Sequence, residues 1–385
     1  MRKICVVTGT RAEYGLLSRL IRMIDESDKT LLQLIATNMH LSSTYGETYK
    51  EIEADGFRID RKIPIIEEGK NDATATLKSM AMAIAGLADA FNELKPDLVT
   101  VLGDRYEILA AAEAALIEKI PIAHIHGGEV TEGAYDDAIR HSITKMSHLH
   151  FPSIDLYRKR IIQMGENPER VFTVGAIGVE NVKRIPLLPK AATEQSIDFV
   201  LDKNTILVTY HPVTLGPDSM KKDIDDFISV LDENENLRVI FTMPNSDTGS
   251  EVIAEAINEF VKNNKERAVA FKSLGLKRYL SVMKEVGAVV GNSSSGIVEA
   301  PSFGVPTLNI GDRQKGRFAP ESVVNCGTNK ESIKIGLNKV LSADFQTFCK
   351  TVKNPYGKEN TVEEIFKVIS SYPLDNIIQK HFYDL

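Results

Sequence analysis

Short apolar runs alternate with stretches of helical periodicity along nearly the whole chain. The runs end at Gly, Pro or polar residues, a pattern that is typical of buried strands. The predicted strands are 3–8, 32–37, 97–102, 120–125, 148–152, 205–210, 237–242, 268–271, 287–291 and 305–310. Because helical patterns separate successive strands, the chain is predicted to belong to the α/β class, with parallel sheets covered by helices on both faces.

Two similar openings divide the chain into halves. The stretches KICVVTGT at 3–10 and NTILVTYHP at 204–212 each run from a polar start through an apolar strand to an abrupt turn. Between them, residues 185–196 are rich in Pro and small residues and predict a linker. The pattern therefore predicts two Rossmann-like, doubly wound domains. The predicted parts are 1–178, 198–360 and a helical segment, 361–385, that packs back on the first domain.

The ends of the predicted strands are crowded with Gly, charged and amide residues. Ligands of doubly wound sheets bind at the carboxyl ends of the strands, and two such domains can face each other across a cleft. The stretches that follow the strands are Gly9–Arg11, Gly103–Arg105, His124–Glu129, His211–Pro212, Pro244–Asp247, Gly291–Gly296 and Gly311–Gln314. Their composition predicts that a polar ligand binds at these ends.

Three arginines, Arg11, Arg105 and Arg313, follow closely after strand-ending glycines. A guanidinium is a planar fork of donors that matches phosphate oxygens. Three of them at equivalent strand ends predict a diphosphate site. The alternatives are surface charges or partners for a nearby carboxylate, as Asp104 would be for Arg105.

The GNSSSG stretch at 291–296 precedes a helix that is predicted to begin near Ile297. Small residues let backbone N–H groups approach an anion at a helix N-terminus, where the helix dipole is favourable. The alternative is a Ser-rich N-cap. The stretch is not a P-loop, because no Gly-Lys-Ser/Thr follows it.

Acidic residues form a second set at the strand ends of the first domain. Asp104, Glu129 and Asp136 or Asp137 lie at or after neighbouring strands, and carboxylates gathered in a partly closed cleft can transfer protons. At roughly 100° per helical residue, Asp136 lies about 60° from the apolar Ile139 and Asp137 about 160°. We therefore expect Asp136 to point inward and Asp137 to be solvated. The alternative for either residue is an acid that stabilises the helix N-terminus.

Histidines also lie at strand ends. His124 and His126, with a nearby Glu, match part of a zinc ligand pattern. No other set of residues has metal-ligand spacing, so no metal is expected. His211 precedes Pro212, where it either stabilises a turn or contacts phosphate and protonates a leaving group.

Composition excludes some classes of protein. The 385 residues are 43% hydrophobic and 26% charged, with a formal net charge of −7, which disfavours a general nucleic-acid binder. The three cysteines show no C-x-x-C spacing and are expected to be reduced thiols. The N-terminus predicts a strand rather than a signal peptide, and no stretch reaches the roughly 18 apolar residues of a membrane span. We expect a cytoplasmic protein without a membrane partner.

Eight motifs, taken in order, resemble one family. They are GTRAEYG, GDRYE, HIHGGE, YDDAIRHSITKMSHLHF, HPVT, PNSDTGS, GNSSSGIVEAPSFG and NIGDRQKGR, which span about residues 2–320. Together they resemble the hydrolysing UDP-N-acetylglucosamine 2-epimerases, bacterial enzymes that make N-acetylmannosamine for sialic acid synthesis. The resemblance implies a glycosyltransferase-B-like pair of Rossmann domains, a UDP-sugar substrate and a homodimer, and no cofactor is expected.

The resemblance also implies roles for individual residues. The residues implied to bind the UDP-sugar are Arg11, Arg105, His211, Asn245, Ser293, Ser294, Glu299 and Arg313, with Glu299 on the ribose hydroxyls. The residues implied to be catalytic are Asp104, His126, Glu129, Asp136 and His211. Related epimerases carry a Glu where this chain has His126, so His126 and Glu129 both remain candidates for the base that takes the C2 proton.

The mechanism implied by the family is elimination of UDP to a glycal, followed by hydration. Arg11 is then expected to stabilise the departing diphosphate, while Glu13 orients Arg11 or caps the helix. Three alternatives remain open: a non-hydrolysing epimerase, a hydrolase of UDP-2,4-diacetamido-2,4,6-trideoxy-glucose for legionaminic acid, and a glycosyltransferase or non-catalytic sugar-nucleotide binder.

Overall fold

The structure, a computed structural model, describes residues 1–67, 69–70, 72–215 and 219–385. It contains two compact units. The first unit consists of Met1–Glu129, Asp136–Glu180 and Tyr356–Leu385, and the second of Val130–Tyr135 and Asn181–Pro355. Residues 130–135, which fall inside the first domain predicted from the sequence, thus belong to the second unit.

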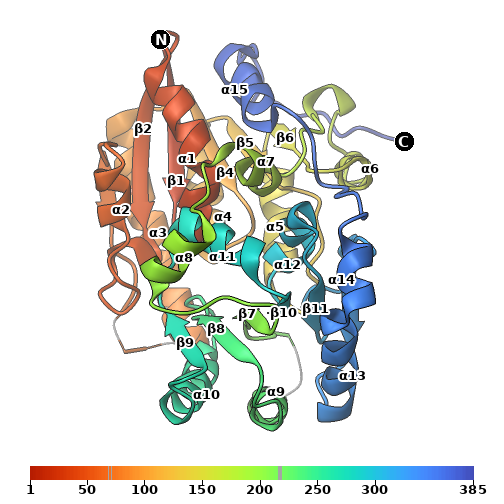
Figure 1. The fold of residues 1–385 in the computed structure, drawn as a ribbon. Helices are drawn as coiled ribbons and strands as arrows, with labels where there is room; N and C mark the ends of the chain where they lie inside the picture. Colours follow the sequence, from red (N-terminus) through yellow and green to blue (C-terminus); the bar gives the residue numbers. More distant parts are fainter. Residues whose placement is uncertain (68, 71, 216–218) are drawn as a thin grey trace. The chain divides into compact units, whose positions relative to one another are not determined.

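The first unit is built on a six-stranded sheet in the order β3-β2-β1-β4-β5-β6, in which every pairing is parallel (Figure 1). The strands are β1 (Arg2–Thr8), β2 (Thr30–Thr37), β3 (Arg61–Ile63), β4 (Leu98–Leu102), β5 (Ile122–Ile125) and β6 (Leu149–Phe151). Alternate residues of β1 point to opposite faces. Ile4 and Val6 join the core on one face, and Cys5 and Val7 join the core on the other.

Helices cover both faces of the first sheet. They are α1 (Arg11–Glu26), α2 (Tyr49–Ala54), α3 (Ala73–Leu94), α4 (Tyr106–Ile117), α5 (Asp136–Met146), α6 (Asp155–Gln163), the start of α7 (Ile177–Arg184) and α15 (Thr361–Ser371), with 3₁₀ turns at Asn38–Leu41 and Pro168–Arg170. The face with Ile4 packs on α1 and α15, and the face with Cys5 packs on α3 and α4. Burial on both faces explains why the strands read as continuous apolar runs.

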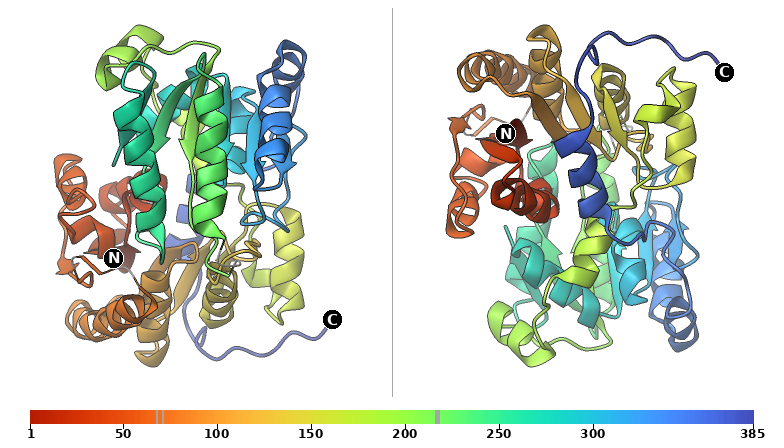
Figure 2. Two further views of the ribbon diagram at one scale, coloured as in Figure 1. Left: turned by 90° about the horizontal axis from the view of Figure 1, so that it is seen from below. Right: turned by 90° about the horizontal axis from the view of Figure 1, so that it is seen from above.

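The second unit repeats this plan with the order β12-β11-β10-β7-β8-β9, also all parallel. The strands are β7 (Thr205–Thr209), β8 (Arg238–Thr242), β9 (Ala268–Phe271), β10 (Ala288–Gly291), β11 (Thr307–Ile310) and β12 (Val323–Cys326). The helices are α8 (Lys190–Ile197), α9 (Met220–Glu233), α10 (Ser250–Asn263), α11 (Gly275–Glu285), α12 (Ser295–Val298), α13 (Lys330–Leu341) and α14 (Ala343–Cys349), with a 3₁₀ turn at Ala300–Phe303. On one face α9 and α10 lie side by side (Figure 2).

The predicted α/β class with two doubly wound sheets is confirmed, and two edge strands were missing from the prediction. Both β3 and β12 have a neighbour on one side only, and their short sequences, RKI and VVNC, include polar or exposed positions. A half-solvated edge strand lacks the continuous apolar run that marks a buried strand. No described helix combines the length and apolarity that crossing a bilayer requires.

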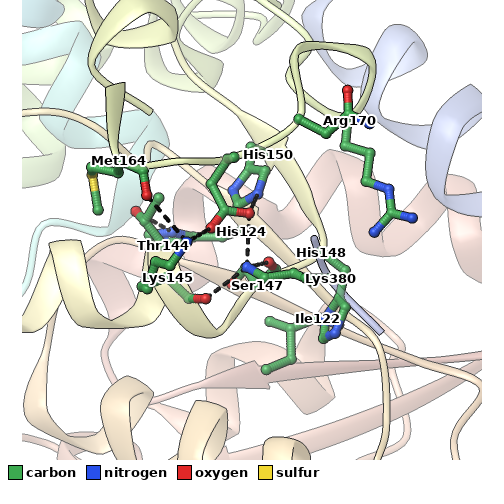
Figure 3. A network of polar contacts seen from close by, with 12 residues as sticks. Ile122, His124, Thr144, Lys145, Ser147, His148, His150, Met164, Arg170 and Lys380 are labelled. Carbon is green, nitrogen blue, oxygen red and sulfur yellow. Dashed lines mark hydrogen bonds and ion pairs between the residues drawn. The ribbon is translucent and has the colours of Figure 1, made fainter. Parts of the chain in front are cut away.

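The C-terminal segment is anchored to the first unit at two places. α15 packs on α1 (Figure 2). The guanidinium of Arg2 donates to the Ile369 and Tyr372 carbonyls at 2.8 Å each. Further along, Lys145, His150 and Lys380 converge on the buried carboxylate of Glu166 (Figure 3).

The buried carboxylate of Glu166 is surrounded by two lysines and a histidine. Lys145 and Lys380 each donate to Glu166 at 2.7 Å, and His150 Nε2 lies 3.1 Å away. Burial alone would raise the pKa of Glu166, but these three neighbours lower it to about 2. Lys380 also donates to the carbonyls of Lys145 and Ser147 at the end of α5, so the C-terminal segment caps that helix.

Candidate active site

Both sheets reverse their strand order at one point, between β1 and β4 in the first unit and between β7 and β10 in the second. In sheets of this kind, ligands bind in the crevice outside the carboxyl ends of the strands at that point. The candidate residues predicted from the sequence follow the carboxyl ends of β1, β4, β5, β7, β8, β10 and β11, and Asp136 begins α5. In each unit, the side of the sheet at which the strands have their carboxyl ends is called its carboxyl-end edge. The edge of the first unit is described first.

The loop between β1 and α1 is closed by a capping box. Thr10 Oγ1 accepts from the Glu13 N–H at 3.3 Å, and Glu13 Oε2 accepts from the N–H groups of Gly9 and Thr10 at 2.8 and 3.1 Å. Capping is one of the two roles predicted for Glu13. Burial, reinforced by the charge of Glu107, raises the pKa of Glu13 to about 8. Arg11 is the first residue of α1 and is half-buried.

A buried ion pair lies at the end of β4. Arg105 Nε donates to Glu107 Oε1 at 2.8 Å, and Glu107 is fully buried. A Cβ atom on Gly9 would lie 2.2 Å from the same Glu107 oxygen, so the glycine leaves room for this carboxylate. Because Glu107 occupies Nε, a diphosphate contact by Arg105 would use the other guanidinium nitrogens.

Asp104 is ion-paired with Arg140 of α5, which is itself buried. Next to them, His124 Nε2 lies 2.7 Å from the Gly103 carbonyl oxygen and Nδ1 lies 3.1 Å from Thr144 Oγ1. Burial lowers the pKa of His124 to about 3, so the ring is neutral. Its two nitrogens thus connect β4 to α5, which accounts for His124 without a zinc ion.

The first turn of α5 places its two acids differently. Asp136 is 7% exposed, whereas Asp137 is half-exposed and its carboxylate lies 3.6 Å from His141 Nε2. The predicted helical phase is therefore confirmed. Arg140 follows Asp136 by four residues, so both project from the buried face of α5.

A tight turn leads the chain out of β5 through HIHGGE. His126 has a φ of 64°, in the left-handed region, and Gly128 has a φ of 75°. A Cβ on Gly128 would lie 2.6 Å from the Tyr157 carbonyl oxygen, so only glycine fits there. The turn brings the side chain of Glu129 close to that of His126.

His126 and Glu129, the two candidate bases, are neighbours. His126 Nδ1 lies 3.6 Å from Glu129 Oε1, and that oxygen also accepts from Ser153 Oγ at 2.9 Å. His126 Nε2 accepts from the Ile177 N–H at 3.4 Å. In this tautomer the proton of the neutral ring is on Nδ1, the nitrogen that faces Glu129.

The edge of the second sheet is organised around one buried amide. Asn292 Oδ1 accepts from the His211 N–H at 2.7 Å, and Asn292 Nδ2 donates to the His211 carbonyl at 2.8 Å. Gly291 has a φ of 129°, and a Cβ there would lie 2.0 Å from the Thr209 carbonyl oxygen. The ends of β7 and β10 are therefore locked together, and His211 is buried between them.

The loop after β11 is tied to the same asparagine. Arg313 Nη1 and Gln314 Nε2 donate to the Asn292 carbonyl oxygen at 3.1 and 2.9 Å. The buried Nε of Arg313 has no hydrogen-bond partner among the described residues. An acceptor from a bound ligand would satisfy this donor.

Of the remaining candidates of the second unit, Ser293, Ser294 and Glu299 flank α12, and Asn245 follows β8. This helix begins at Ser295 and not near Ile297 as predicted, and it is a single turn. The earlier start lets Ser295 Oγ bond Ser293 Oγ at 3.2 Å and Tyr279 OH at 2.6 Å. The other candidates, Asn245, Ser294 and Glu299, are half-buried.

Four residues of these edges were not among the predicted site residues: Glu107, Arg140, Asn292 and Gln314. Asn292 lies inside the GNSSSG stretch, and Gln314 follows Arg313 directly. The sequence could have predicted Arg140, because its four-residue spacing from Asp136 places both on one helix face. No sequence pattern indicated the pairing of Glu107 with Arg105.

Comparisons with known proteins agree on one family. A family model described as UDP-N-acetylglucosamine 2-epimerase matches residues 22–370. A Campylobacter jejuni protein named GDP/UDP-N,N′-diacetylbacillosamine 2-epimerase (hydrolyzing) is 43% identical, over 100% of this chain and 99% of its own length. A polysialic acid biosynthesis protein from Escherichia coli is 40% identical, over 100% and 98%. The crystal structure of a Neisseria meningitidis UDP-GlcNAc 2-epimerase bound to UDP-GlcNAc has the same fold, with a TM-score of 0.78, 19% identity and coverage of 95% and 99%.

Proposed function

The chain belongs to the UDP-N-acetylglucosamine 2-epimerase family, and we propose that it is a hydrolysing 2-epimerase of a UDP-activated 2-acetamido sugar. The observation that carries the proposal is the acidic edge of the first sheet. Asp104, Glu129 and Asp136 are set at or after the carboxyl ends of β4 and β5, where doubly wound sheets bind ligands. The relative named as a hydrolysing 2-epimerase supports this reaction.

The proposed reaction has two steps. A base removes the proton at C2 while the bond from C1 to the UDP oxygen breaks, and a glycal forms. Water then adds its hydroxyl to C1, and C2 receives a proton on the opposite face. The products are UDP and the free sugar with inverted C2. We assign the first proton transfer to Glu129, because His126 Nε2 already accepts the Ile177 N–H and the proton on Nδ1 faces Glu129.

Asp104 and Asp136 serve the hydration step in this proposal. Arg140 is ion-paired with Asp104 and shares the buried face of α5 with Asp136, so the two acids are held on one rigid framework. Positioned carboxyl groups of this kind contribute by general acid–base catalysis.

The UDP moiety is assigned to the edge of the second sheet. The buried Nε of Arg313 supports a diphosphate contact, and His211 beside it would donate to the leaving phosphate oxygen. Asn245, Ser293, Ser294 and Glu299 line the same edge, with Glu299 proposed for the ribose hydroxyls. Arg11 and Arg105 are proposed to stabilise the diphosphate as it departs.

Two sugars are candidates for the substrate. UDP-N-acetylglucosamine, which would yield N-acetylmannosamine for sialic acid synthesis, is supported by the family description. UDP-N,N′-diacetylbacillosamine, the 2,4-diacetamido-2,4,6-trideoxy sugar of the legionaminic acid alternative, is supported by the name of the C. jejuni relative. Both have the 2-acetamido group and the C2 proton that the reaction needs.

We further propose that the enzyme is a cytoplasmic homodimer. Leu77 and Ile84, seven residues apart on the same side of α3, are 65% and 38% exposed. Exposed apolar residues that share a helix side are candidates for a protein–protein interface. A second copy of the chain that covered α3 would bury them, and light scattering in solution tests this.

The decisive experiment is turnover in D₂O. Purified protein incubated with either UDP-sugar should release UDP and a free sugar with deuterium at C2, which NMR detects. Release of sugar without deuterium would exclude the elimination route. Return of a UDP-linked epimer would identify a non-hydrolysing epimerase, and UDP release only with an added acceptor would identify a glycosyltransferase.

A further inference from the structure

His124 lies in β5, between β4 and β6, and no step of the proposed reaction uses it. It is fully buried. A buried imidazole needs a hydrogen-bond partner for each nitrogen, because an unpaired polar atom costs free energy. The partners are the Gly103 carbonyl oxygen, 2.7 Å from Nε2, and Thr144 Oγ1, 3.1 Å from Nδ1. All three residues belong to the first unit, so their geometry is defined within that unit.

These partners determine where the ring carries its proton. A carbonyl oxygen can only accept, so the proton is on Nε2. Burial lowers the pKa of His124 to about 3, so the ring has no second proton near neutral pH. Nδ1 is therefore an acceptor, and the Thr144 hydroxyl is its donor. The same hydroxyl lies 2.9 Å from the Arg140 carbonyl oxygen, one turn earlier in α5, so Thr144 links the ring to this helix.

A further contact joins the two side chains to the turn that leads to Glu129. A Cβ atom on Gly127 would lie 2.9 Å from Thr144 Oγ1 and 3.0 Å from His124 Nδ1. The glycine therefore allows the turn to pack directly on both polar groups. Gly127 follows His126 and comes two residues before Glu129. A displacement of either polar side chain would thus change the path of this turn.

Two of the contacts bear on Asp104. Gly103 precedes Asp104 and shares a peptide group with it, so the bond from His124 Nε2 fixes the orientation of that group at the end of β4. The carbonyl of Arg140 lies at the Thr144 hydroxyl, while its guanidinium is ion-paired with the Asp104 carboxylate. Asp104 is therefore held through its backbone and through its side chain by groups that meet at one hydrogen bond.

We propose that His124 and Thr144 are positioning residues for the acids of the first unit. Their hydrogen bond fixes where Asp104 and Glu129 lie relative to each other. The inference rests on the proposed proton transfers by these acids. Both positioning residues are fully buried, so they act through the acids and not on the substrate. Rates are sensitive to such placement, because a catalytic group that is misplaced by about 1 Å loses about 10²-fold in rate.

The first test removes and restores the donor to His124. Thr144→Val keeps the shape of the side chain without its hydroxyl, and kcat should fall about three- to tenfold, the equivalent of one lost hydrogen bond. KM and UDP affinity should stay nearly unchanged, because the lost bond is not made to the substrate. Thr144→Ser restores the hydroxyl and should restore most of kcat.

Thr100→Val is the matched control. Thr100 is fully buried in β4, and its hydroxyl has no hydrogen-bond partner among the residues that the structure describes. The same substitution at this position should therefore leave kcat at the wild-type value.

The second test shows whether the two residues act through one bond. His124→Phe keeps a ring but removes both nitrogens, so it should lower kcat more than Thr144→Val. The double variant should be little slower than His124→Phe, because one bond cannot be lost twice. Losses that multiply would overturn the proposal. If His124→Phe does not fold, Gly127→Ala replaces it: the new methyl group crowds both side chains and should lower kcat at unchanged KM, and wild-type kcat in this variant would also overturn the proposal.

The third test observes the ring directly. Nitrogen-15 NMR of histidine-labelled protein should show His124 protonated at Nε2 alone at neutral pH. A proton on Nδ1 would overturn the proposal, because Thr144 would then not be the donor.

The outcomes distinguish two failures. If the wild type turns over neither UDP-sugar, the proposed function fails and the positioning role fails with it. If the wild type is active and Thr144→Val keeps its full kcat, only the positioning role is overturned. Equal losses of kcat in Thr144→Val and Thr144→Ser would also overturn it, because the hydroxyl would then not matter.

Discussion

The two units share a strand order but not the chemistry of their carboxyl-end edges. In the first, the edge carries buried charges in pairs, with Asp104 on Arg140 and Glu107 on Arg105. In the second, the equivalent edge is held by a neutral amide, Asn292, whose side chain bonds both backbone groups of His211. One topology thus supports either an edge of paired charges or an edge held by a neutral amide.

The difference explains how each edge stays rigid. Ion pairs between carboxylates and guanidinium groups hold the acids of the first unit in place. An asparagine cannot ionise, so the edge it holds keeps its shape over a wide pH range. We expect pH to affect turnover through the first unit more than nucleotide affinity through the second.

The largest effect should come from neutralising the acidic edge. Asp104→Asn, Glu129→Gln and Asp136→Asn should each lower kcat by about 10²–10⁴, the usual loss for a positioned acid or base. UDP affinity, measured by calorimetry, should stay nearly intact because the nucleotide is assigned to the other unit. A variant that eliminates but cannot hydrate should release the glycal, which NMR can identify.

Asp137→Asn is the control for this series, because Asp137 is half-exposed on the same helix turn. It should retain full activity and a normal melting temperature. Loss of UDP binding in all three acid variants would erase the distinction between the edges and would make the acids structural.

The next largest effect is a loss of stability when Glu166, which is not among the site residues of the first unit, loses its charge. Glu166→Gln leaves Lys380, which is largely buried, without its counter-charge, so the free energy of unfolding should fall by about 3 kcal/mol. The lowered pKa of Glu166 stabilises the folded state above about pH 4.5, and this stability is lost as pH falls toward 2. Acid unfolding followed by circular dichroism should therefore be less steep in the variant. A change in UDP affinity would show that the network reaches the ligand site.

Most strands of the two sheets were predictable from the sequence, but the partners of the site residues at the carboxyl ends of the strands were only partly predictable. Central strands buried on both faces are continuous apolar runs, whereas most residues of β3 and β12 are exposed or half-exposed. The inward phase of Asp136 followed from helical periodicity. The partners were not predictable in the same way: Asp104 and Arg140 are 36 residues apart and meet only after β4, β5 and α5 have assembled.

A smaller effect is expected at the edge of the second sheet. Arg313→Ala should weaken UDP binding by about 1.5–3 kcal/mol, typical of lost hydrogen bonds to a charged group. Ser294→Ala should weaken it less, because its backbone N–H remains. Calorimetry with UDP measures both. Unchanged affinity in Arg313→Ala would remove this residue from the proposed nucleotide site.

The smallest effect concerns Glu13, the acid that caps α1. Its pKa, raised to about 8, means that folding disfavours its charged form. Glu13 therefore lowers the free energy of unfolding as pH rises from about 4.5 through 8, and it has no such effect at lower pH. Glu13→Gln keeps an oxygen for the N–H groups of Gly9 and Thr10 and removes the charge. We therefore expect Glu13→Gln to be more stable than the wild type at pH 8 and equally stable at pH 5. Thermal melting at the two pH values measures it. A loss of stability at pH 8 would mean that the ionised carboxylate is the better cap, and this buried acid would then belong with the charge pairs that set the first edge apart from the second.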